Sequence, residues 1–391
     1  MNVILKVTKR CNLRCRYCYE RPYHQDETAL TVRKVEAIFQ KIRAYCMEEP
    51  GRHHLEFIWH GGEPMLLPSS FYWKVLDLQE HFFADRRKFH LINGIQTNLT
   101  LLDDDYITLF KTRRMGVVGV SFDVANQNRV YRNGRATDEV VIRNMDRLAL
   151  EQIPHSGLCV ISRKNIGAID EIYRFFRNRG ICFSIIPTHH LGWRKGTALG
   201  ITAGEYARAA RRLFDLWFYD RDAEMFITDF SVMISNLTHA EDGPGSCCYS
   251  KRCPEHTVHV DPDGTTYLCS RMNLGGYIYG NIFRQTFKEI MDSPARRLVL
   301  SRFDRIAGKC GACEFFQNCY GGCMNMGQTQ GRFLEKSVLC SYYRMMFAHI
   351  RSRLSQHGLV TKEGRLRRDH QQILPKIIPP QELSHFPEWP A

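Results

Sequence analysis

Two spacings of apolar residues alternate along residues 2–187. Short runs rich in β-branched and aromatic residues predict strands, whereas apolar residues three and four positions apart predict helices. The first helical pattern runs from Val32 to Ile42 and follows Thr31, a residue type that caps helix N-termini. The predicted strands are residues 2–7, 55–59, 89–96, 117–122, 158–161 and 183–187. Further helices are predicted at about residues 70–83, from Asp103, and at about 138–150 and 168–178.

This alternation of strands and helices predicts an α/β fold. Sequential strands joined by helices form a parallel sheet with right-handed crossovers. We therefore predict a partial (β/α)6 TIM-like barrel over residues 1–190. In such a barrel the chemistry gathers where the strands end, at their C-terminal edge.

Three further regions follow the predicted barrel. Residues 191–246 break the alternation and contain an amphipathic helix at 203–218, so we predict a helical bridge. Residues 247–350 are rich in cysteine and form a second predicted domain. Residues 351–391 contain five prolines and predict a C-terminal tail, either extended over the body or loose.

Composition indicates a globular protein with metal sites. The chain has 391 residues, of which 44% are hydrophobic, and it contains no apolar run of membrane-spanning length. No signal peptide precedes Cys11, so we predict a cytoplasmic protein, in which fifteen cysteines indicate metal ligation. Lys and Arg residues give a net charge of +13 but are scattered, and no nucleic-acid-binding motif accompanies them. Exposure of these residues on a solvated surface is the simplest explanation of the charge. Binding of an acidic peptide or of nucleic acid is the alternative.

The strongest chemical signal is the loop at residues 9–18, where Cys11, Cys15 and Cys18 form a CxxxCxxC pattern. One short loop can turn three thiolates toward a single inorganic core. A [4Fe–4S] cluster usually takes four cysteines, so three leave one iron open for a ligand. A zinc site is the alternative, although zinc usually takes four protein ligands in structural sites.

This pattern, with Tyr17 before the last cysteine, resembles the signature of radical S-adenosylmethionine (SAM) enzymes. The resemblance implies that Cys11, Cys15 and Cys18 hold a catalytic cluster whose open iron chelates the amino and carboxylate groups of SAM. It also implies that Glu63, in the His-Gly-Gly-Glu-Pro segment after the second predicted strand, contacts the SAM amino group. The implied SAM-binding residues are Tyr17, Gly61, Gly62, Glu63, Asn98, Ser121 and Asp123.

The cysteines after residue 246 resemble the SPASM domain, which binds two auxiliary [4Fe–4S] clusters. The resemblance implies three clusters in total and an interleaved set of ligands. Cys247, Cys253, Cys269 and Cys323 would hold the first auxiliary cluster, and Cys310, Cys313, Cys319 and Cys340 the second. Cys248 competes with Cys247 for the first, and a zinc ribbon is the alternative for the whole region.

Other charged and cysteine residues have simpler interpretations. Arg10, Arg14 and Arg16 surround the first cysteine loop and could offset its anionic thiolates. The remaining cysteines lie within helix or strand patterns and are predicted to be buried apolar residues: Cys46, Cys159 and Cys182.

The resemblance implies a radical SAM oxidoreductase of the peptide-modifying SPASM type. An electron from flavodoxin or ferredoxin would start the cleavage of SAM to methionine and a 5′-deoxyadenosyl radical, which takes a hydrogen atom from the substrate. Two subgroups fit: anaerobic sulfatase maturases, which make formylglycine, and maturases that crosslink ribosomally made precursor peptides. In sulfatase maturases an aspartate proposed as the base follows the cysteine that matches Cys269, but here the residue is Ser270.

Ser270 therefore favours crosslinking of a precursor peptide, with a carbon–carbon (cyclophane) link ahead of a thioether and sulfatase maturation as the alternative. A hypothesis of another class is a scaffold with an iron–sulfur core or a nucleic-acid binder. Neither would need a cysteine loop with one open iron or the Gly-Gly-Glu-Pro segment. We expect catalysis, with a peptide substrate and no nucleic-acid or membrane partner.

Overall fold

The structure is a computed structural model that describes residues 1–188, 198–238, 253–269, 277–328 and 333–361. The chain forms two compact units. The first unit comprises Met1–Asp123, Gln127–Leu158 and Pro254–Arg302, and the second comprises Val124–Asn126, Cys159–Cys253 and Phe303–Ala391. Within the described ranges, no helix is long and apolar enough to cross a membrane.

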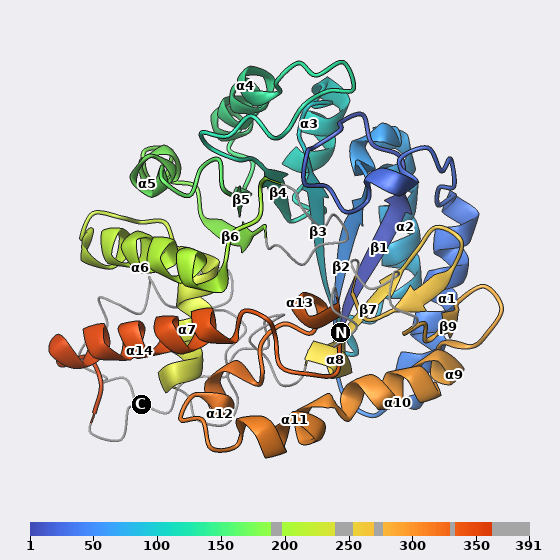
Figure 1. Ribbon diagram of the computed structural model, residues 1–391. Coiled ribbons are helices and arrows are strands. Elements are labelled where there is room, and N and C mark those ends of the chain that lie inside the picture. Colours follow the sequence, from blue (N-terminus) through green and yellow to red (C-terminus); the bar gives the residue numbers. More distant parts are fainter. Residues whose placement is uncertain (189–197, 239–252, 270–276, 329–332, 362–391) are drawn as a thin grey trace. The chain divides into compact units, whose positions relative to one another are not determined.

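The first unit is built on parallel strands joined by helices (Figure 1). Its strands are β1 (Asn2–Thr8), β2 (His53–Gly61), β3 (Phe89–Thr97), β4 (Val117–Ser121) and the first part of β5 (His155–Ile161). Its helices include α1 (Val32–Glu48), α2 (Ser69–Phe82), α3 (Asp104–Lys111) and α4 (Asp138–Leu150), with short 3-10 turns η1 (Arg21–Tyr23) and η2 (Pro64–Leu66). The pairs from β1 to β5 are all parallel, which confirms the predicted α/β class.

The first unit also contains strands that the sequence pattern did not predict. These are β7 (Thr257–Val260), β8 (Thr265–Tyr267) and β9 (Gly280–Asn281). The helices of this region are α8 (Cys253–His256) apart from its first residue, α9 (Phe287–Met291) and α10 (Pro294–Leu300). Strand β7 pairs with β1 in parallel, and β8 and β9 continue antiparallel. The strand order is β6-β5-β4-β3-β2-β1-β7-β8-β9, so β1 lies inside the sheet and not at its edge.

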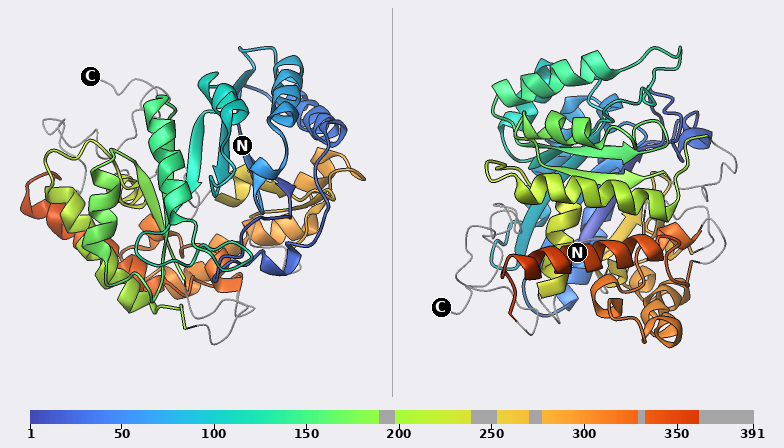
Figure 2. Two further views of the ribbon diagram at one scale, coloured as in Figure 1. Left: turned by 90° about the horizontal axis from the view of Figure 1, so that it is seen from above. Right: turned by 60° about the vertical axis from the view of Figure 1, so that its left-hand side comes forward.

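Aromatic side chains on one face of β2 attach α1 and α2 to the sheet. Phe57 and Trp59 are two residues apart on β2, so their side chains point to the same face. The ring of Phe39 on α1 lies 5.1 Å from Phe57, and that of Tyr72 on α2 lies 5.9 Å from Trp59, both edge to face. Both helices therefore cover one face of the strands that carry the candidate site (Figure 2).

Two helix starts in this unit, those of α1 and α3, follow capping residues in the sequence. The hydroxyl of Thr31 accepts a hydrogen bond from the backbone N–H of Lys34 at 3.3 Å. The carboxylate of Asp103 accepts one from the backbone N–H of Tyr106 at 2.8 Å. Each satisfies a donor that the first turn of a helix leaves open, which explains why both predicted starts are confirmed.

The second unit is mainly helical. It contains the end of β5, β6 (Phe183–Pro187), α5 (Ile169–Arg177), α6 (Ala203–Tyr219), α7 (Thr228–Thr238), α12 (Phe316–Cys319), α13 (Asn325–Gln328), α14 (Cys340–Gln356) and all of α11 (Arg302–Cys310) except its first residue. Helices α6 and α14 run side by side (Figure 2). The Tyr206 and Tyr342 rings lie 4.5 Å apart between them, and Asp215 pairs with Arg353 at 3.0 Å. Helix α14 continues past residue 350, where the sequence placed the start of the tail.

Candidate active site

The loop after β1 gathers its three cysteines in one small cluster. Cys11 and Cys15 are buried around Leu13, and Cys18 and Tyr131 pack against them. Backbone hydrogen bonds fix the loop, because the N–H groups of residues 14 and 16 donate to the carbonyl oxygens of residues 130 and 128 at 2.7 and 2.9 Å. The sequence-predicted ligands Cys11, Cys15 and Cys18 therefore lie together at the C-terminal end of β1.

Burial sets the charge state of these thiols. It raises the pKa of Cys11 and Cys15, and it raises the pKa of Cys18 to about 12. Free thiols in this loop are thus neutral near pH 7, and iron ligation would release their protons. Among the described residues, no three His, Cys, Asp or Glu side chains are placed to hold one metal ion. Thiolates of a [4Fe–4S] cube bind different irons, so the donor set of this loop fits such a cube.

Arg129 is one of the positive charges beside the loop. Its Nε lies 3.3 Å from Oδ2 of Asp123, and its guanidinium carbon lies 5.6 Å from the ring centre of Tyr17. The Tyr17 hydroxyl donates to the same Asp123 oxygen. Asp123 and Tyr17, both predicted as SAM contacts, thus hold Arg129 against the cysteine loop.

The arginines that the sequence offered as counter-charges are exposed to solvent. Arg14 and Arg16 are exposed, and the side chain of Arg10 is 54% exposed. Burial raises the pKa of the Cys15 thiol, but the charge of Arg129 acts in the opposite direction and favours the thiolate. Arg129 escaped the sequence analysis because it is more than a hundred residues from the cysteines and belongs to no motif.

Gly61 and Gly62 let the backbone after β2 approach the cysteine loop. The Gly62 N–H donates to the Thr8 carbonyl at 2.8 Å, and the Glu63 N–H donates to the Arg10 carbonyl at 2.9 Å. A Cβ on Gly62 would lie 2.1 Å from the Arg10 carbonyl oxygen, and one on Gly61 would lie 2.3 Å from that of Thr8. Gly61 also has φ of +145°, which favours glycine. The close approach predicted for these glycines is made here to the protein's own loop.

Gly62→Ala should therefore destabilise the protein by roughly 1–3 kcal/mol, because backbone atoms must move to admit the methyl group. Chemical denaturation of the SAM-free protein measures the effect. Gly94→Ala is the matched control, since a Cβ at this position on β3 would meet its nearest atom at 3.8 Å. Equal stability of both variants would contradict the close approach.

The carboxylate of Glu63 is buried and has one acceptor position left. Its Oε1 accepts hydrogen bonds from the Thr97 hydroxyl at 2.7 Å and the Met65 N–H at 2.9 Å, and its Oε2 accepts one from the Asn98 N–H at 2.7 Å. A carboxylate offers about four acceptor positions, so Oε2 can accept one more donor. Burial raises the pKa of Glu63 to about 7. These features fit a carboxylate that contacts an amino group.

The other predicted SAM contacts lie at the ends of neighbouring strands. The Asn98 side-chain amide donates to Asn12 in the cysteine loop at 2.9 Å and lies 3.9 Å from the Cys11 sulfur. Ser121 accepts a hydrogen bond from the Gln96 side chain at 2.9 Å. In the described part of the chain, Ser121 makes no hydrogen bond to the cysteine loop. The structure thus brings Asn98 to the loop, but not Ser121.

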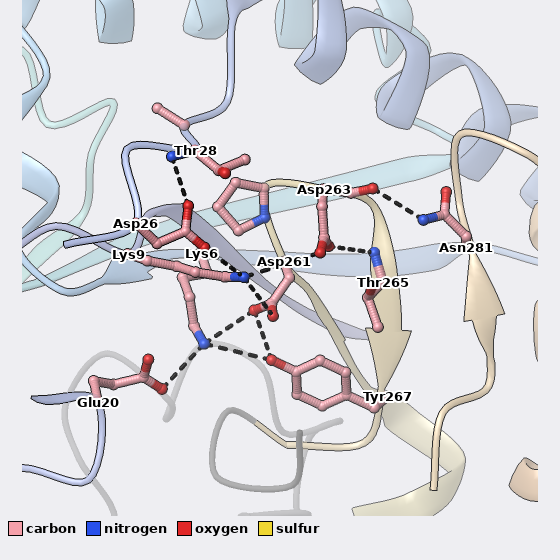
Figure 3. Close-up of polar contacts among 12 residues, drawn as sticks. Lys6, Lys9, Glu20, Asp26, Thr28, Asp261, Asp263, Thr265, Tyr267 and Asn281 are labelled. Atoms are coloured by element: carbon pink, nitrogen blue, oxygen red, sulfur yellow. Dashed lines mark hydrogen bonds and ion pairs between the residues drawn. The ribbon is translucent and has the colours of Figure 1, made fainter. Parts of the chain in front are cut away.

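A second buried polar group joins Lys6 on β1 to Asp261, which directly follows β7 (Figure 3). The Lys6 ammonium lies 3.0 Å from both Glu20 Oε1 and Asp261 Oδ1. The Tyr267 hydroxyl donates to the same Asp261 oxygen at 2.6 Å, and His259 Nε2 lies 3.3 Å from it. Burial lowers the pKa of His259 to about 4, so its neutral ring donates to Asp261. The sequence analysis missed this group because its members are up to 261 residues apart.

In the second unit, the predicted ligands of one auxiliary cluster come together. Cys310 ends α11, Cys319 ends α12 and Cys340 begins α14, while Cys313 lies in the turn between α11 and α12. Burial, together with the neighbouring thiols of Cys340, Cys313 and Cys310, raises the pKa of Cys319 to about 11. The other three thiols therefore lie within electrostatic reach of Cys319, as ligands of the same cluster must.

The other predicted auxiliary set is divided between the units. Cys269 follows β8 in the first unit, whereas Cys253 and Cys323 belong to the second. Cys247 and its competitor Cys248 lie outside the described residues, as does Ser270.

Two family models match this chain over the regions just described. The radical SAM superfamily matches residues 5–176, which contain the cysteine loop, Glu63 and the strands β1 to β5. The iron–sulfur cluster-binding SPASM domain matches residues 247–314. The chain carries a radical SAM domain and a SPASM domain. Its cofactors are accordingly SAM and iron–sulfur clusters, as the sequence predicted.

Relatives of this radical SAM chain match along most of its length. The serine-type anaerobic sulfatase-maturating enzyme of Klebsiella aerogenes is 28% identical over 350 residues, which are 87% of this chain and 82% of that one. The cysteine-type anaerobic sulfatase-maturating enzyme of Clostridium perfringens (strain 13 / Type A) is 25% identical over 368 residues, 90% of this chain and 96% of that one.

A solved structure shares the fold of most of this chain. The structure of native anSMEcpe with bound AdoMet and Cp18Cys peptide has a TM-score of 0.79 at 24% identity and covers 91% of this chain and 98% of that chain. This likeness confirms the predicted architecture of a radical SAM domain followed by a SPASM domain. Cys319, Cys323 and Cys340 lie beyond the matched SPASM residues, so their assignment as ligands still rests on their spacing and, for Cys319 and Cys340, on the geometry above.

Proposed function

We propose that this chain is a radical SAM oxidoreductase that converts a seryl or cysteinyl side chain of a protein substrate to formylglycine, since its relatives are named serine-type and cysteine-type anaerobic sulfatase-maturating enzymes. The observation that supports this most is the cysteine loop lying against the acceptor carboxylate of Glu63. The relatives match most of the chain, which extends the likeness beyond the radical SAM domain.

In this proposal, the chain's residues hold the reactants and exclude water. Cys11, Cys15 and Cys18 hold one cluster, Glu63 Oε2 accepts from the SAM amino group, and Asn98 lies beside the first cysteine. When bound and reduced by flavodoxin or ferredoxin, the cluster and SAM supply a 5′-deoxyadenosyl radical that takes a hydrogen atom from the substrate. Arg129, mostly buried against Tyr17 and Asp123, keeps positive charge beside the thiolates.

The SPASM cysteines would hold two auxiliary clusters, which brings the total to three. Cys310, Cys313, Cys319 and Cys340 are the ligands of one, and Cys247 or Cys248, Cys253, Cys269 and Cys323 those of the other. Four cysteines saturate each cube, so neither auxiliary cluster has an open iron. Their proposed role is to accept the electron that the substrate radical releases as it becomes the product.

A second candidate is crosslinking of a ribosomally made precursor peptide. Ser270 favours it, because a serine cannot serve as the carboxylate base expected at that position in a sulfatase maturase. The product would be a carbon–carbon link of the cyclophane type or, second, a thioether. The relatives fit formylglycine formation better, so crosslinking ranks below it here although the sequence alone ranked it first.

The product decides between the two candidates. Anaerobically reconstituted enzyme, SAM and reductant should convert the Cp18Cys peptide to an aldehyde that reacts with hydrazines. Mass spectrometry after hydrazine treatment measures the aldehyde, and deuterium at the cysteine Cβ should appear in 5′-deoxyadenosine. A peptide with the target cysteine replaced by alanine is the matched control. A hydrazine-inert product lighter by two hydrogens would instead establish crosslinking.

A further inference from the structure

The two halves of the cysteine loop are held in place by different contacts of the first unit. Around Cys15, backbone N–H groups of the loop donate to carbonyl oxygens in residues 128–130. After Cys18 the backbone bonds stay within the loop, from the Cys18 N–H to the Cys15 carbonyl at 3.2 Å and from the Tyr23 N–H to the Glu20 carbonyl at 2.8 Å. A side chain, that of Glu20, links this second half to the sheet.

The link from Glu20 to the sheet is a buried ion pair. Its Oε1 lies 3.0 Å from the ammonium of Lys6 on β1, and the two side chains are at most 4% exposed (Figure 3). The same ammonium lies 3.0 Å from Asp261, which accepts a hydrogen bond from the Tyr267 hydroxyl at 2.6 Å. Moving the Glu20 carboxylate away would leave the buried ammonium with one partner fewer, which costs free energy. Lys6 therefore gives Glu20 a fixed partner.

The backbone of Glu20 contacts the last thiol of the loop. Its N–H donates a hydrogen bond to the Cys18 sulfur. When a cluster is bound, hydrogen bonds to the ligating sulfurs are among the factors that set its reduction potential. Such a bond stabilises the reduced cluster more than the oxidised one, because the reduced cluster carries one more negative charge. The position of the Glu20 N–H therefore affects how readily the cluster accepts an electron.

We propose that Lys6 and Glu20 are positioning residues whose ion pair holds the Glu20 N–H on the Cys18 sulfur and thereby raises the reduction potential of the SAM-binding cluster. A higher potential makes transfer of one electron from flavodoxin or ferredoxin to the cluster more favourable. This role rests on the proposed function only in that Cys18 is taken as a cluster ligand. It holds for either product, formylglycine or a crosslink.

Two neutral replacements of Glu20 separate the ion pair's positioning effect from its charge. Glu20→Gln keeps an oxygen that can accept a hydrogen bond from Lys6, whereas Glu20→Met has a similar volume but no such acceptor. Both variants lack the carboxylate, so its charge does not contribute to the difference between them. Both leave Lys6 paired with Asp261. The matched control pair is Glu27→Gln and Glu27→Met, because the Glu27 side chain is 83% exposed.

Electron paramagnetic resonance of the anaerobically reconstituted, SAM-free protein at a fixed potential measures the reduced cluster. The relevant signal is the part that is absent when Cys11, Cys15 and Cys18 are all replaced by alanine. At the midpoint potential of the wild type, the ratio of reduced to oxidised cluster should be roughly three- to tenfold lower in Glu20→Met than in Glu20→Gln, because a hydrogen bond to a charged sulfur is lost. The two Glu27 variants should give equal ratios.

Equal ratios in Glu20→Gln and Glu20→Met at full iron content would overturn the proposal. If Glu20→Met does not take up iron, Glu20→Asp decides against the wild type. This variant keeps a carboxylate but shortens its reach by one methylene, so the backbone must leave the Cys18 sulfur for the ion pair to form. A lower ratio in Glu20→Asp would support the positioning role, and a wild-type ratio would overturn it.

The outcomes also separate this role from the proposed reaction. A lower ratio in Glu20→Met without aldehyde from the Cp18Cys peptide would support the positioning role and overturn formylglycine formation. Aldehyde formation with equal ratios in the two Glu20 variants would do the reverse. Absence of any signal that depends on Cys11, Cys15 and Cys18 would overturn both, because both require a cluster at these cysteines.

Discussion

Replacing Cys11, Cys15 and Cys18 together with alanine should remove about four of roughly twelve irons and abolish SAM cleavage. The three thiols form one buried cluster after β1, so no other described cysteine in the first unit can replace them without moving the loop. The auxiliary ligands lie in other segments and should keep their iron. Iron and sulfide assays after anaerobic reconstitution, with chromatography of 5′-deoxyadenosine, measure both effects.

Cys46→Ala is the control for this experiment. Cys46 is buried on α1, 1% exposed, and packs in the core as the sequence predicted. Its replacement should leave iron content and SAM cleavage unchanged, apart from a modest loss of stability. Full iron content in the triple variant, or zinc in place of iron in the wild-type protein, would contradict the assignment of the loop.

The sequence predicted the parallel strands because their signals are local. Strand β3 and helix α2 follow the predicted ranges within a residue, since apolar spacing and capping residues act over a few positions. Strand β7 was missed for the opposite reason. It has only four residues, and its partner β1 lies more than 250 residues away, so no nearby pattern indicates the pairing.

The candidate site likewise contains residues that local sequence motifs predict and residues that they do not. The cysteines and Glu63 could be predicted because the family's motifs fix their spacing, whereas their partners come from elsewhere in the chain. Lys6 occupies a strand position that is fully buried, and the carboxylates of Asp261 and Glu20 make a lysine tolerable there. The sequence alone does not distinguish such a residue from an exposed lysine on a strand. Burial of a charge depends on the partners that tertiary structure supplies.

The second large effect is expected at Glu63. Glu63→Gln should weaken SAM binding about 10- to 100-fold, because the remaining acceptor position on Oε2 is lost together with the negative charge. Three protein donors already point at this carboxylate, from Thr97, Met65 and Asn98. A glutamine side chain has a single acceptor oxygen, so its amide nitrogen would face one of these three donors. Anaerobic equilibrium dialysis with labelled SAM measures the affinity, and Glu36→Gln, an exposed position on α1, is the matched control.

The pH dependence gives Glu63 a signature that a general loss of structure would not produce. Burial raises the pKa of Glu63 to about 7 in the SAM-free protein, whereas contact with an amino group favours the ionised form. SAM affinity of the wild type should therefore rise as the pH increases through about 7, because below that pH the carboxyl proton must first be displaced. In Glu63→Gln this rise should be absent. SAM itself titrates identically in both experiments, so the difference between the two profiles belongs to Glu63. If Glu63→Gln has full iron content and binds SAM with wild-type affinity and pH dependence, Glu63 has only a structural role. That role is to accept a hydrogen bond from the backbone N–H of Met65 at the start of η2.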